Sequence, residues 1–367
     1  MNPALINQNF NSIAAIDLFC GIGGLTNGLR KAGIPVLAGI DQDKSCKYAY
    51  EVNNEAEFIG EDISKISGES LINRYWRDTD LKILVGCAPC QPFSSHSNKI
   101  REEEKIQDIK WNLLSEFLRL IRETQPQIVS MENVPNLSKK NVFLDFVNSL
   151  KKEGYHVQHQ NVYCPDYGIP QKRRRLVLVA SKFGAISLIE KTHEPKNYKS
   201  TFQAIGGLQK LKHGEKSSED PLHFTSKLTD LNLRRIQASK PNGTWLDWDE
   251  ELRLECHKKD SGKTYSSVYG RMTWHEPSPT ITTQFYNFGT GRFGHPEQDR
   301  ALTIREAALL QTFPDNYEFE DPKEPISLKR IATHIGNAVP VDLGYVVGKS
   351  IKEHLNKLQN ERIRIKY

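Results

Sequence analysis

The sequence predicts an α/β protein with a doubly wound, mostly parallel sheet and a smaller irregular domain. Short apolar runs alternate with amphipathic helical segments over the first half of the 367 residues. Glycines follow the first apolar run and open the first helix. Regular periodicity stops near residue 190 and returns near residue 300. Strands that alternate with helices are typical of a parallel sheet with helices on both faces.

The strand candidates are short, apolar and bounded by turn residues. They are residues 12–20, 35–41, 57–63, 81–87, 127–134 and 175–181. Helical periodicity is found at 24–33, 43–53 and 111–124, then again at 300–313 and 339–355. We therefore expect residues 1–189 and 300–367 to form one discontinuous domain, with 190–299 inserted as a second domain.

Composition limits the function classes. The net charge of +5 permits a polyanionic partner without requiring one. No run approaches the roughly 18 to 20 apolar residues of a membrane span, and the first residues do not resemble a secretory signal. Together with six cysteines, this favours a cytoplasmic protein with free thiols and no contact with membranes.

The glycine loop "CGIGGL" is the first candidate site. Gly21 and Gly23 follow a strand and precede a helix, where backbone can approach a ligand closely. Asp41 ends the next strand, 20 residues on, where a carboxylate can bind ribose hydroxyls. Thr26 stands where a dinucleotide fingerprint has its last glycine, which favours a nucleoside over a dinucleotide. Asp62 follows the third strand at the same edge. A tight turn without a ligand remains the alternative.

The stretch "GCAPCQPFS" places Cys87 and Cys90 three residues apart. Zinc would need a second pair, and the other cysteines, Cys20, Cys46, Cys164 and Cys256, are isolated. We expect no metal. Cys87 ends an apolar strand, which indicates buried packing. Cys90 lies just past the strand end, where Pro89 would hold it in a stiff turn, and is therefore the candidate nucleophile.

Charged residues follow two later strand signals. Glu132 ends the strand at 127–134, at the edge where Cys90 is expected. Arg173 and Arg175 belong to a basic run before the last strand, and alternate residues of a strand share a face. The run is either a solvated turn or a clamp for an anion or a base edge.

Six stretches together resemble the cytosine-C5 DNA methyltransferase family in order and spacing, over about 12–181 and 300–350. They are "DLFCGIGG", "GCAPCQPFS", "MENVPN", "GIPQKRRRLVLVA", "REAALLQTFPDNY" and "HIGNAVP". The resemblance implies a Rossmann-like fold, S-adenosylmethionine as cofactor and double-stranded DNA as substrate. It implies a bacterial restriction–modification enzyme, with 190–299 as the target-recognition domain. We expect a monomer near the nucleoid, with a restriction endonuclease as functional partner.

By this resemblance, the Cys90 thiolate adds to C6 of a flipped cytosine, so that C5 can accept the methyl group. Glu132 hydrogen-bonds N3 and the exocyclic amine, Arg175 holds O2, and Arg173 helps to position the thiolate loop. The implied cofactor contacts are Phe19, Gly21, Gly23, Asp41, Asp62, Pro89 and Asn337. The implied DNA contacts are Gln91, Ser94 and Thr280.

The chain departs from the family in "QDIKWNLL". Members often carry arginine and glycine where this chain has Lys110 and Trp111, so the bidentate fork of arginine is lost. Several side chains of 190–299 could read base edges, namely Arg234, Arg235, Arg271, Gln284 and Arg292. Phosphate or solvent contacts are the alternative for each.

Three other functions remain open. An RNA-directed member of the same family would share the chemistry, a nucleic-acid-binding regulator would lack it, and a dehydrogenase would bind NAD. The long segment 190–299 favours sequence reading on DNA over RNA.

Overall fold

The computed structural model describes residues 12–89, 113–259 and 266–366. The chain divides into two compact units. The first comprises Met1–Tyr163, Arg174–Lys191 and Val339–Tyr367, and the second comprises Cys164–Arg173 and Thr192–Ala338. The second unit thus takes in 164–173 and 300–338 besides most of 190–299. The assignment of 1–189 and 300–367 to catalysis and of 190–299 to target recognition stays a prediction.

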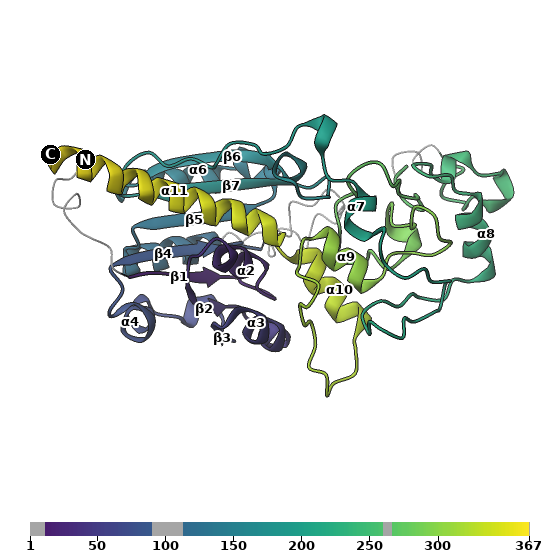
Figure 1. The fold of residues 1–367 in the computed structure, drawn as a ribbon, viewed down its shortest axis with the longest axis horizontal. Helices are drawn as coiled ribbons and strands as arrows, with labels where there is room; N and C mark the ends of the chain where they lie inside the picture. The colour runs from purple at the N-terminus through teal and green to yellow at the C-terminus, as the bar shows by residue number, and fades with distance from the viewer. Residues whose placement is uncertain (1–11, 90–112, 260–265, 367) are drawn as a thin grey trace. The chain divides into compact units, whose positions relative to one another are not determined.

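A seven-stranded sheet forms the centre of the first unit, in the order β3-β2-β1-β4-β5-β7-β6 (Figure 1). Its strands are β1 (Ile13–Leu18), β2 (Val36–Ile40), β3 (Glu57–Ile59), β4 (Leu81–Gly86), β5 (Ile128–Asn133), β6 (His156–Tyr163) and β7 (Arg174–Ser181). The pairings among β1 to β5 are parallel. The predicted α/β fold with a mostly parallel sheet is confirmed.

Strand β7 runs antiparallel to both β5 and β6. Its first residues therefore lie at the edge of the sheet where the parallel strands end. Leu176 pairs with Asn133 and Val177 pairs with Glu132. This reversal brings the basic run at the start of β7 beside the carboxyl end of β5.

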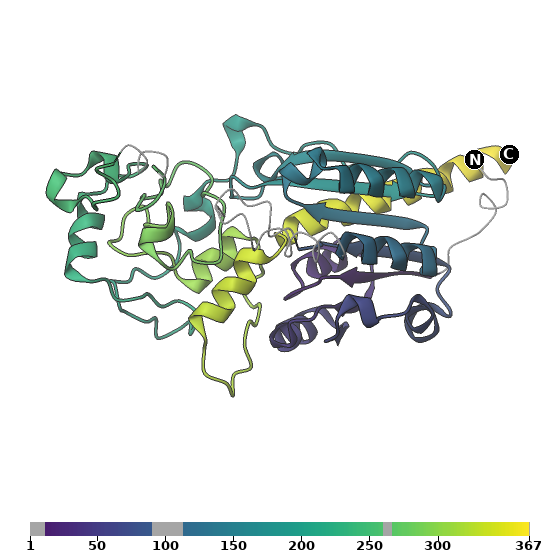
Figure 2. The ribbon, with the colours of Figure 1, turned by 180° about the vertical axis from the view of Figure 1, so that it is seen from behind.

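Helices cover both faces of the sheet (Figures 1 and 2). One face carries α2 (Gly24–Lys31), α3 (Lys47–Asn54) and α11 (Val341–Lys366). The other carries α4 (Gly68–Leu71), the helical segment 113–124 and α6 (Asn141–Lys152). Phe117 and Phe143 from this second layer pack with Ile16 and Leu84 of the sheet in one buried cluster. The C-terminal helix α11, which was predicted over 339–355, packs against α2.

Several elements of the first unit differ from expectation, and helices α4 and α6 are not among the predicted helices. Strand β6 is not among the predicted strands. It is the outermost strand of the sheet, and most of its residues are polar and exposed, so it lacks the apolar pattern of a buried strand. Helix α11 extends to Lys366, well beyond residue 355. Within the described residues, no helix is long and apolar enough to span a membrane.

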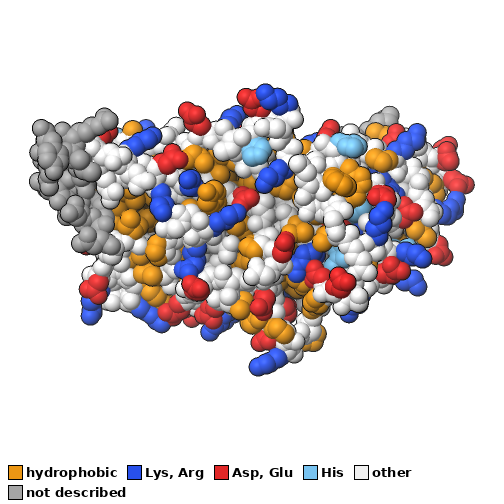
Figure 3. All heavy atoms as spheres, in the orientation of Figure 1, with side chains coloured by type: hydrophobic (Ala, Val, Ile, Leu, Met, Phe, Trp, Pro, Cys, Tyr) orange, Lys and Arg blue, Asp and Glu red, His pale blue; other side chains and the backbone are white. Residues whose placement is uncertain are grey.

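The second unit contains the short helices α7 (Thr201–Ile205), α8 (Asp230–Ala238), α9 (Ile304–Leu310) and α10 (Leu328–Asn337), joined by irregular segments. Its buried apolar cluster includes Trp245, Trp248 and Phe288. Basic and acidic side chains are interspersed on the face in Figure 3, so charge does not mark one binding region on that face.

Candidate active site

The glycine loop connects β1 to α2 and is tied to the end of β2. The amide of Gly21 donates a 2.9 Å hydrogen bond to Oδ2 of Asp41. Phe19, Gly21 and Gly23 have positive φ angles of 58°, 49° and 84°. Only glycine adopts such angles readily, so Phe19 holds a strained conformation at this turn. A Cβ at Gly21 would meet nothing within 4 Å, which leaves its backbone open to a ligand.

Thr26 has a structural reason to replace the last fingerprint glycine. Its hydroxyl donates to Oδ2 of Asp17 at 2.7 Å and lies 3.1 Å from the hydroxyl of Tyr50. All three side chains are buried. Burial is the main cause that raises the pKa of Asp17 to about 7, and the Thr26 hydrogen bond opposes it. Thr26 therefore donates a hydrogen bond to the buried carboxyl of Asp17, in the strand that precedes the glycine loop.

Asp62 begins the turn after β3. Its Oδ1 accepts from the amide of Ser64 at 2.9 Å and from the Ser64 hydroxyl at 2.8 Å. The backbone hydrogen bond is the main cause that lowers the pKa of Asp62. Because β1 to β3 are parallel, the loop, Asp41 and Asp62 all belong to the carboxyl edge of the sheet, where ligands bind in such folds.

Glu132 lies at the same edge and is almost fully buried, with 5% of its side chain exposed. Nε of Arg175 is 2.7 Å from Oε1 of Glu132. The two form an ion pair, but the N–H is not aligned for a hydrogen bond. Among the described residues, no donor hydrogen-bonds Oε1. A buried acceptor without a hydrogen bond is costly, so this oxygen is suited to accept one from a ligand.

The thiol of Cys87 donates to the other oxygen, Oε2 of Glu132, at 2.7 Å. Cys87 follows β4 and is held by its amide, which donates to the carbonyl of Leu18 at 3.2 Å. The prediction that Cys87 is buried packing is wrong, because the residue is only half-buried and its sulfur contacts a carboxylate. The sequence signal was its position one residue past a strand end; that β4 pairs with β5, the strand of Glu132, comes from the structure.

Asn133 fixes the turn that leads to the predicted nucleophile. Its buried side-chain amide donates to the carbonyl of Ala88 at 2.9 Å. Its Oδ1 accepts from the amide of Val134 at 2.9 Å. Sequence reasoning missed this residue. Pro89 is exposed directly after this turn. Cys90, Gln91 and Ser94 lie outside the described residues, as do Lys110 and Trp111.

Arg173 differs from Arg175 in its partners. It precedes the first residue of β7 and lies in the second unit, where its guanidinium is buried. It donates to the carbonyls of Ile281 at 3.1 Å and Ala338 at 3.2 Å. The strand alternation that predicted a shared face does not extend to Arg173. The side chain joins the segment 277–285 to the end of α10.

The remaining predicted site residues lie in the same unit. The hydroxyl of Thr280 donates to the carbonyl of Lys172 at 3.0 Å. Asn337 is exposed at the last position of α10. Beside it, Gly336 packs so tightly that a Cβ would lie 2.5 Å from the backbone of Thr282. The structure thus joins "HIGNAVP" to 277–285, which are far apart in sequence.

Two candidates for reading base edges are structural instead. Arg271 is buried and donates to the carbonyl of Ile236 at 2.7 Å and to Asp299 at 2.6 Å. Arg235 is buried and donates to the carbonyl of Leu252 at 2.9 Å. Neither guanidinium is available to DNA.

The other candidates are more accessible. Arg234 is exposed and pairs with Glu251. Arg292 is half-buried and donates to the carbonyl of Asn242 at 2.6 Å. Gln284 is exposed. The structure therefore leaves Gln284 and Arg234 as the most accessible side chains of the original five.

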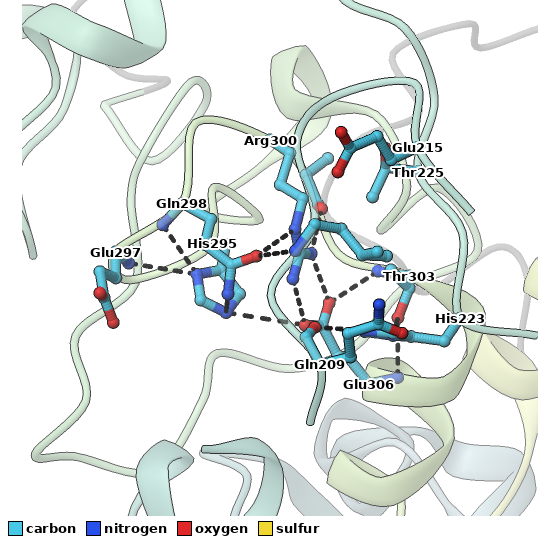
Figure 4. Close-up of polar contacts among 12 residues, drawn as sticks. Gln209, Glu215, His223, Thr225, His295, Glu297, Gln298, Arg300, Thr303 and Glu306 are labelled. Carbon is cyan, nitrogen blue, oxygen red and sulfur yellow. Dashed lines mark hydrogen bonds and ion pairs between the residues drawn. The ribbon is translucent and has the colours of Figure 1, made fainter. Parts of the chain in front are cut away.

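A buried ion pair anchors the start of α9 (Figure 4). Arg300 donates to both carboxylate oxygens of Glu306, at 2.7 and 2.8 Å. Glu306 also accepts a hydrogen bond from the amide of Thr303 at 2.8 Å. Burial alone would raise the pKa of Glu306, but the charge and hydrogen bonds of Arg300 outweigh burial and lower this pKa to about 2. His295 lies 3.6 Å from Glu306, and burial lowers its pKa to about 4. Glu306 of "REAALLQTF" is therefore a structural residue.

Comparison with known proteins shows which family the chain belongs to. The model of the family described as C-5 cytosine-specific DNA methylase matches residues 13–353. The chain belongs to this family. The type II methylase M.HgiDII of Herpetosiphon aurantiacus is 55% identical over 96% of this chain and 99% of its own. The type II methyltransferase M.Eco47II of Escherichia coli is 32% identical over 95% of this chain and 81% of its own.

The fold of this DNA cytosine-5-methyltransferase also matches solved structures. A prophage-encoded DNA modification methyltransferase of E. coli aligns with a TM-score of 0.72 and 21% identity, covering 94% of this chain and 100% of the other. The predicted enzyme class and the restriction–modification type are confirmed by the family and its relatives. These matches favour DNA methylation over the RNA-directed, silent-regulator and dehydrogenase alternatives.

Proposed function

We propose that this methylase uses S-adenosylmethionine and a Cys90 thiolate to methylate C5 of a cytosine flipped out of double-stranded DNA. The observation that supports this proposal is the buried carboxylate of Glu132, whose Oε1 lies beside Arg175 and accepts no hydrogen bond from the part of the chain that the structure describes. It lies at the sheet edge that also carries the glycine loop. A base and a methyl donor bound at one edge can react there.

The residues at this edge fit a nucleoside cofactor. The carboxylates of Asp41 and Asp62 suit the hydroxyl and amine donors of an adenosyl group. The space at Gly21, where a Cβ would meet nothing within 4 Å, leaves room for the amino-acid part beside the start of α2. Phe19, Gly23, Pro89 and Asn337 are further contacts implied by the family motifs. When bound, the cofactor supplies the methyl group.

The protein residues prepare the base for this transfer. C5 of cytosine is a weak nucleophile until the Cys90 thiolate forms a bond with C6. Glu132 binds N3 and the exocyclic amine, which favours protonation at N3 as the thiolate adds. Arg175 holds O2. The C5 proton then passes to a base, the sulfur–carbon bond breaks to restore the thiolate, and the proton on N3 returns to solvent, which leaves neutral 5-methylcytosine.

Arg173 acts as a positioning residue in this proposal. Its guanidinium is occupied by backbone carbonyls, so it is suited to holding backbone in place and not to contacting the base. Gln91, Ser94 and Thr280 are proposed contacts to DNA near the target. Residues 190–299 are proposed to read the DNA sequence, with Gln284 and Arg234 as accessible candidates.

The wider setting is also a proposal. The relatives are named type II methylases, which fits a role beside a restriction endonuclease that cleaves the same unmethylated sequence. We propose a monomer that works on DNA in the cytoplasm near the nucleoid. The endonuclease is a functional partner and need not bind the methylase.

Transfer of a labelled methyl group from S-adenosylmethionine tests the proposal. Duplex DNA should be labelled and tRNA should not. Cys90→Ala should lower the rate by roughly a thousandfold or more, because removal of a covalent nucleophile removes the pathway, while cofactor affinity changes little. Full activity of Cys90→Ala, or label found only in tRNA, would refute the proposal.

A further inference from the structure

Cys87 and Glu132 form a contact that the proposed reaction does not yet use. The thiol occupies Oε2 of the carboxylate at 2.7 Å, while Arg175 approaches Oε1 from β7. The carboxylate is thus held by one side chain just past the end of β4 and one near the start of β7, the two strands that flank β5. This arrangement leaves Oε1 as the oxygen without a hydrogen bond among the described residues.

The neutral thiol is the form of Cys87 that matches this contact. A thiolate would place a second negative charge against a buried carboxylate, which is unfavourable at this distance. A neutral S–H group is a weak donor, and it can stabilise the carboxylate without competing strongly for it. Cys87 is therefore unsuited to be the nucleophile and suited to orient Glu132.

The backbone around Cys87 is fixed well enough for this role. The amide of Cys87 is hydrogen-bonded to Leu18 of β1, and the next carbonyl, that of Ala88, accepts from Asn133. Asn133 is also the neighbour of Glu132 on β5. The sulfur and the carboxylate are thus placed by the same pair of adjacent strands.

We propose that Cys87 is a positioning residue for the methyl-transfer reaction, which donates its thiol hydrogen to Oε2 of Glu132 and turns Oε1 toward the target base. This inference depends on the proposed role of Glu132. It assigns different tasks to the two cysteines of "CAPC": Cys87 orients the carboxylate and Cys90 attacks the base.

A double-mutant cycle tests the inference. The full-length variants are Cys87→Ala, Cys87→Ser, Glu132→Gln and the double variant Cys87→Ala with Glu132→Gln. Cys87→Ala should lower kcat about tenfold, as expected for losing a hydrogen bond to a charged group, with little change in KM for DNA or cofactor. Cys87→Ser keeps a donor and should retain most of the activity.

The effect of Cys87→Ala in a protein that also carries Glu132→Gln shows whether the thiol acts through Glu132. If the thiol works through Glu132, Cys87→Ala should change kcat less than about twofold once Glu132→Gln is present. Cys256→Ala removes an exposed thiol elsewhere and should behave as wild type. Thermal unfolding and cofactor titration of each variant detect loss of folding, which would lower binding along with kcat.

Each outcome is informative. A normal rate for Cys87→Ala, a rate for Cys87→Ser as low as that of Cys87→Ala, or an undiminished Cys87→Ala effect in the Glu132→Gln background would each overturn the inference alone. Full activity of Glu132→Gln would instead overturn the proposed role of Glu132, and this inference with it.

Discussion

At the scale of single residues, the buried carboxyl of Asp17 makes stability depend on pH. Its pKa rises from an ordinary 3.8 to about 7 in the folded protein, mainly because of burial. Between these values the folded state binds more protons than the unfolded state, so stability falls as pH rises from about 4 to 7. The loss amounts to roughly 4 kcal/mol and is complete above pH 7.

Asp17→Asn should therefore be more stable than wild type at pH 8 and lose this advantage at pH 4. The amide can still accept from Thr26 and carries no charge to bury. Urea unfolding at the two pH values measures the difference. Asp145→Asn, at an exposed position of α6, is the control and should show no such change. An Asp17→Asn effect that is the same at both pH values would contradict this account.

The roles of some single residues could be predicted from the sequence, and the roles of others could not. Glu132 was predictable because a carboxylate at the end of an apolar strand stands out in the sequence. The pairing of Arg175 with it was not, because it depends on the antiparallel direction of β7. The roles of Cys87, Asn133, Arg235 and Arg271 come from partners distant in the sequence, which no local pattern encodes.

At the scale of elements, α2 and α11 approach so closely that glycine is needed between them. A Cβ at Gly28 would lie 2.2 Å from the carbonyl oxygen of Val341 and 2.5 Å from the amide nitrogen of Tyr345. Neither backbone atom can move alone. Gly28→Ala should therefore reduce the free energy of unfolding by roughly 2 to 3 kcal/mol, measured in urea.

Gly207→Ala is the matched control for Gly28→Ala. A Cβ at Gly207 meets nothing within 4 Å, and the residue is exposed. The variant should unfold as wild type does. Equal effects of the two substitutions would show that the α2–α11 contact does not constrain this position.

The ion pair that anchors α9 should make the second unit sensitive to acid. Glu306, with its pKa near 2, contributes stability above pH 4.5 that is lost as pH falls toward 2. His295 is buried and has its pKa lowered to about 4, so stability also falls as pH drops from 6.5 to 4. Glu306→Gln leaves Arg300 without its charge partner and should reduce stability at pH 7 by roughly 3 to 5 kcal/mol.

Tryptophan fluorescence during urea unfolding can follow this effect, because Trp245, Trp248 and Trp274, three of the five tryptophans, belong to the second unit. Glu297→Gln is the control, since Glu297 is exposed and forms a surface pair with Lys210. It should change stability by less than about 1 kcal/mol. A Glu306→Gln protein as stable as Glu297→Gln would contradict a structural role for the buried pair.

The elements show which patterns predict structure. The apolar strands β1, β2, β4, β5 and β7 were predictable because buried strands of a covered sheet are apolar throughout. Strand β6 was missed because it lies at the edge and exposes polar residues. Helix α10 was missed although its buried residues Ile331, Ala332 and Ile335 recur at helical spacing, because it spans only 10 residues and follows an irregular segment.

At the scale of the whole molecule, the family and the long second unit predict methylation of one short sequence. Cells that express the protein should carry C5-methylated cytosine at a single recurring motif, which bisulfite sequencing reports together with its flanks. If either Gln284 or Arg234 reads a base, its substitution should reduce the preference of the enzyme for that motif or the extent of methylation at it. Methylation scattered without a motif would contradict sequence reading by this protein.

The central claim is that Cys90 bonds to C6 of the target cytosine, and trapping that bond tests it most directly. DNA with 5-fluorocytosine at the target cannot lose a C5 proton after methyl transfer, so the protein should stay attached. Mass spectrometry of the digested complex should place the adduct on Cys90, and Cys90→Ala should form none. An adduct on Cys87, or turnover of this DNA without any adduct, would contradict the account.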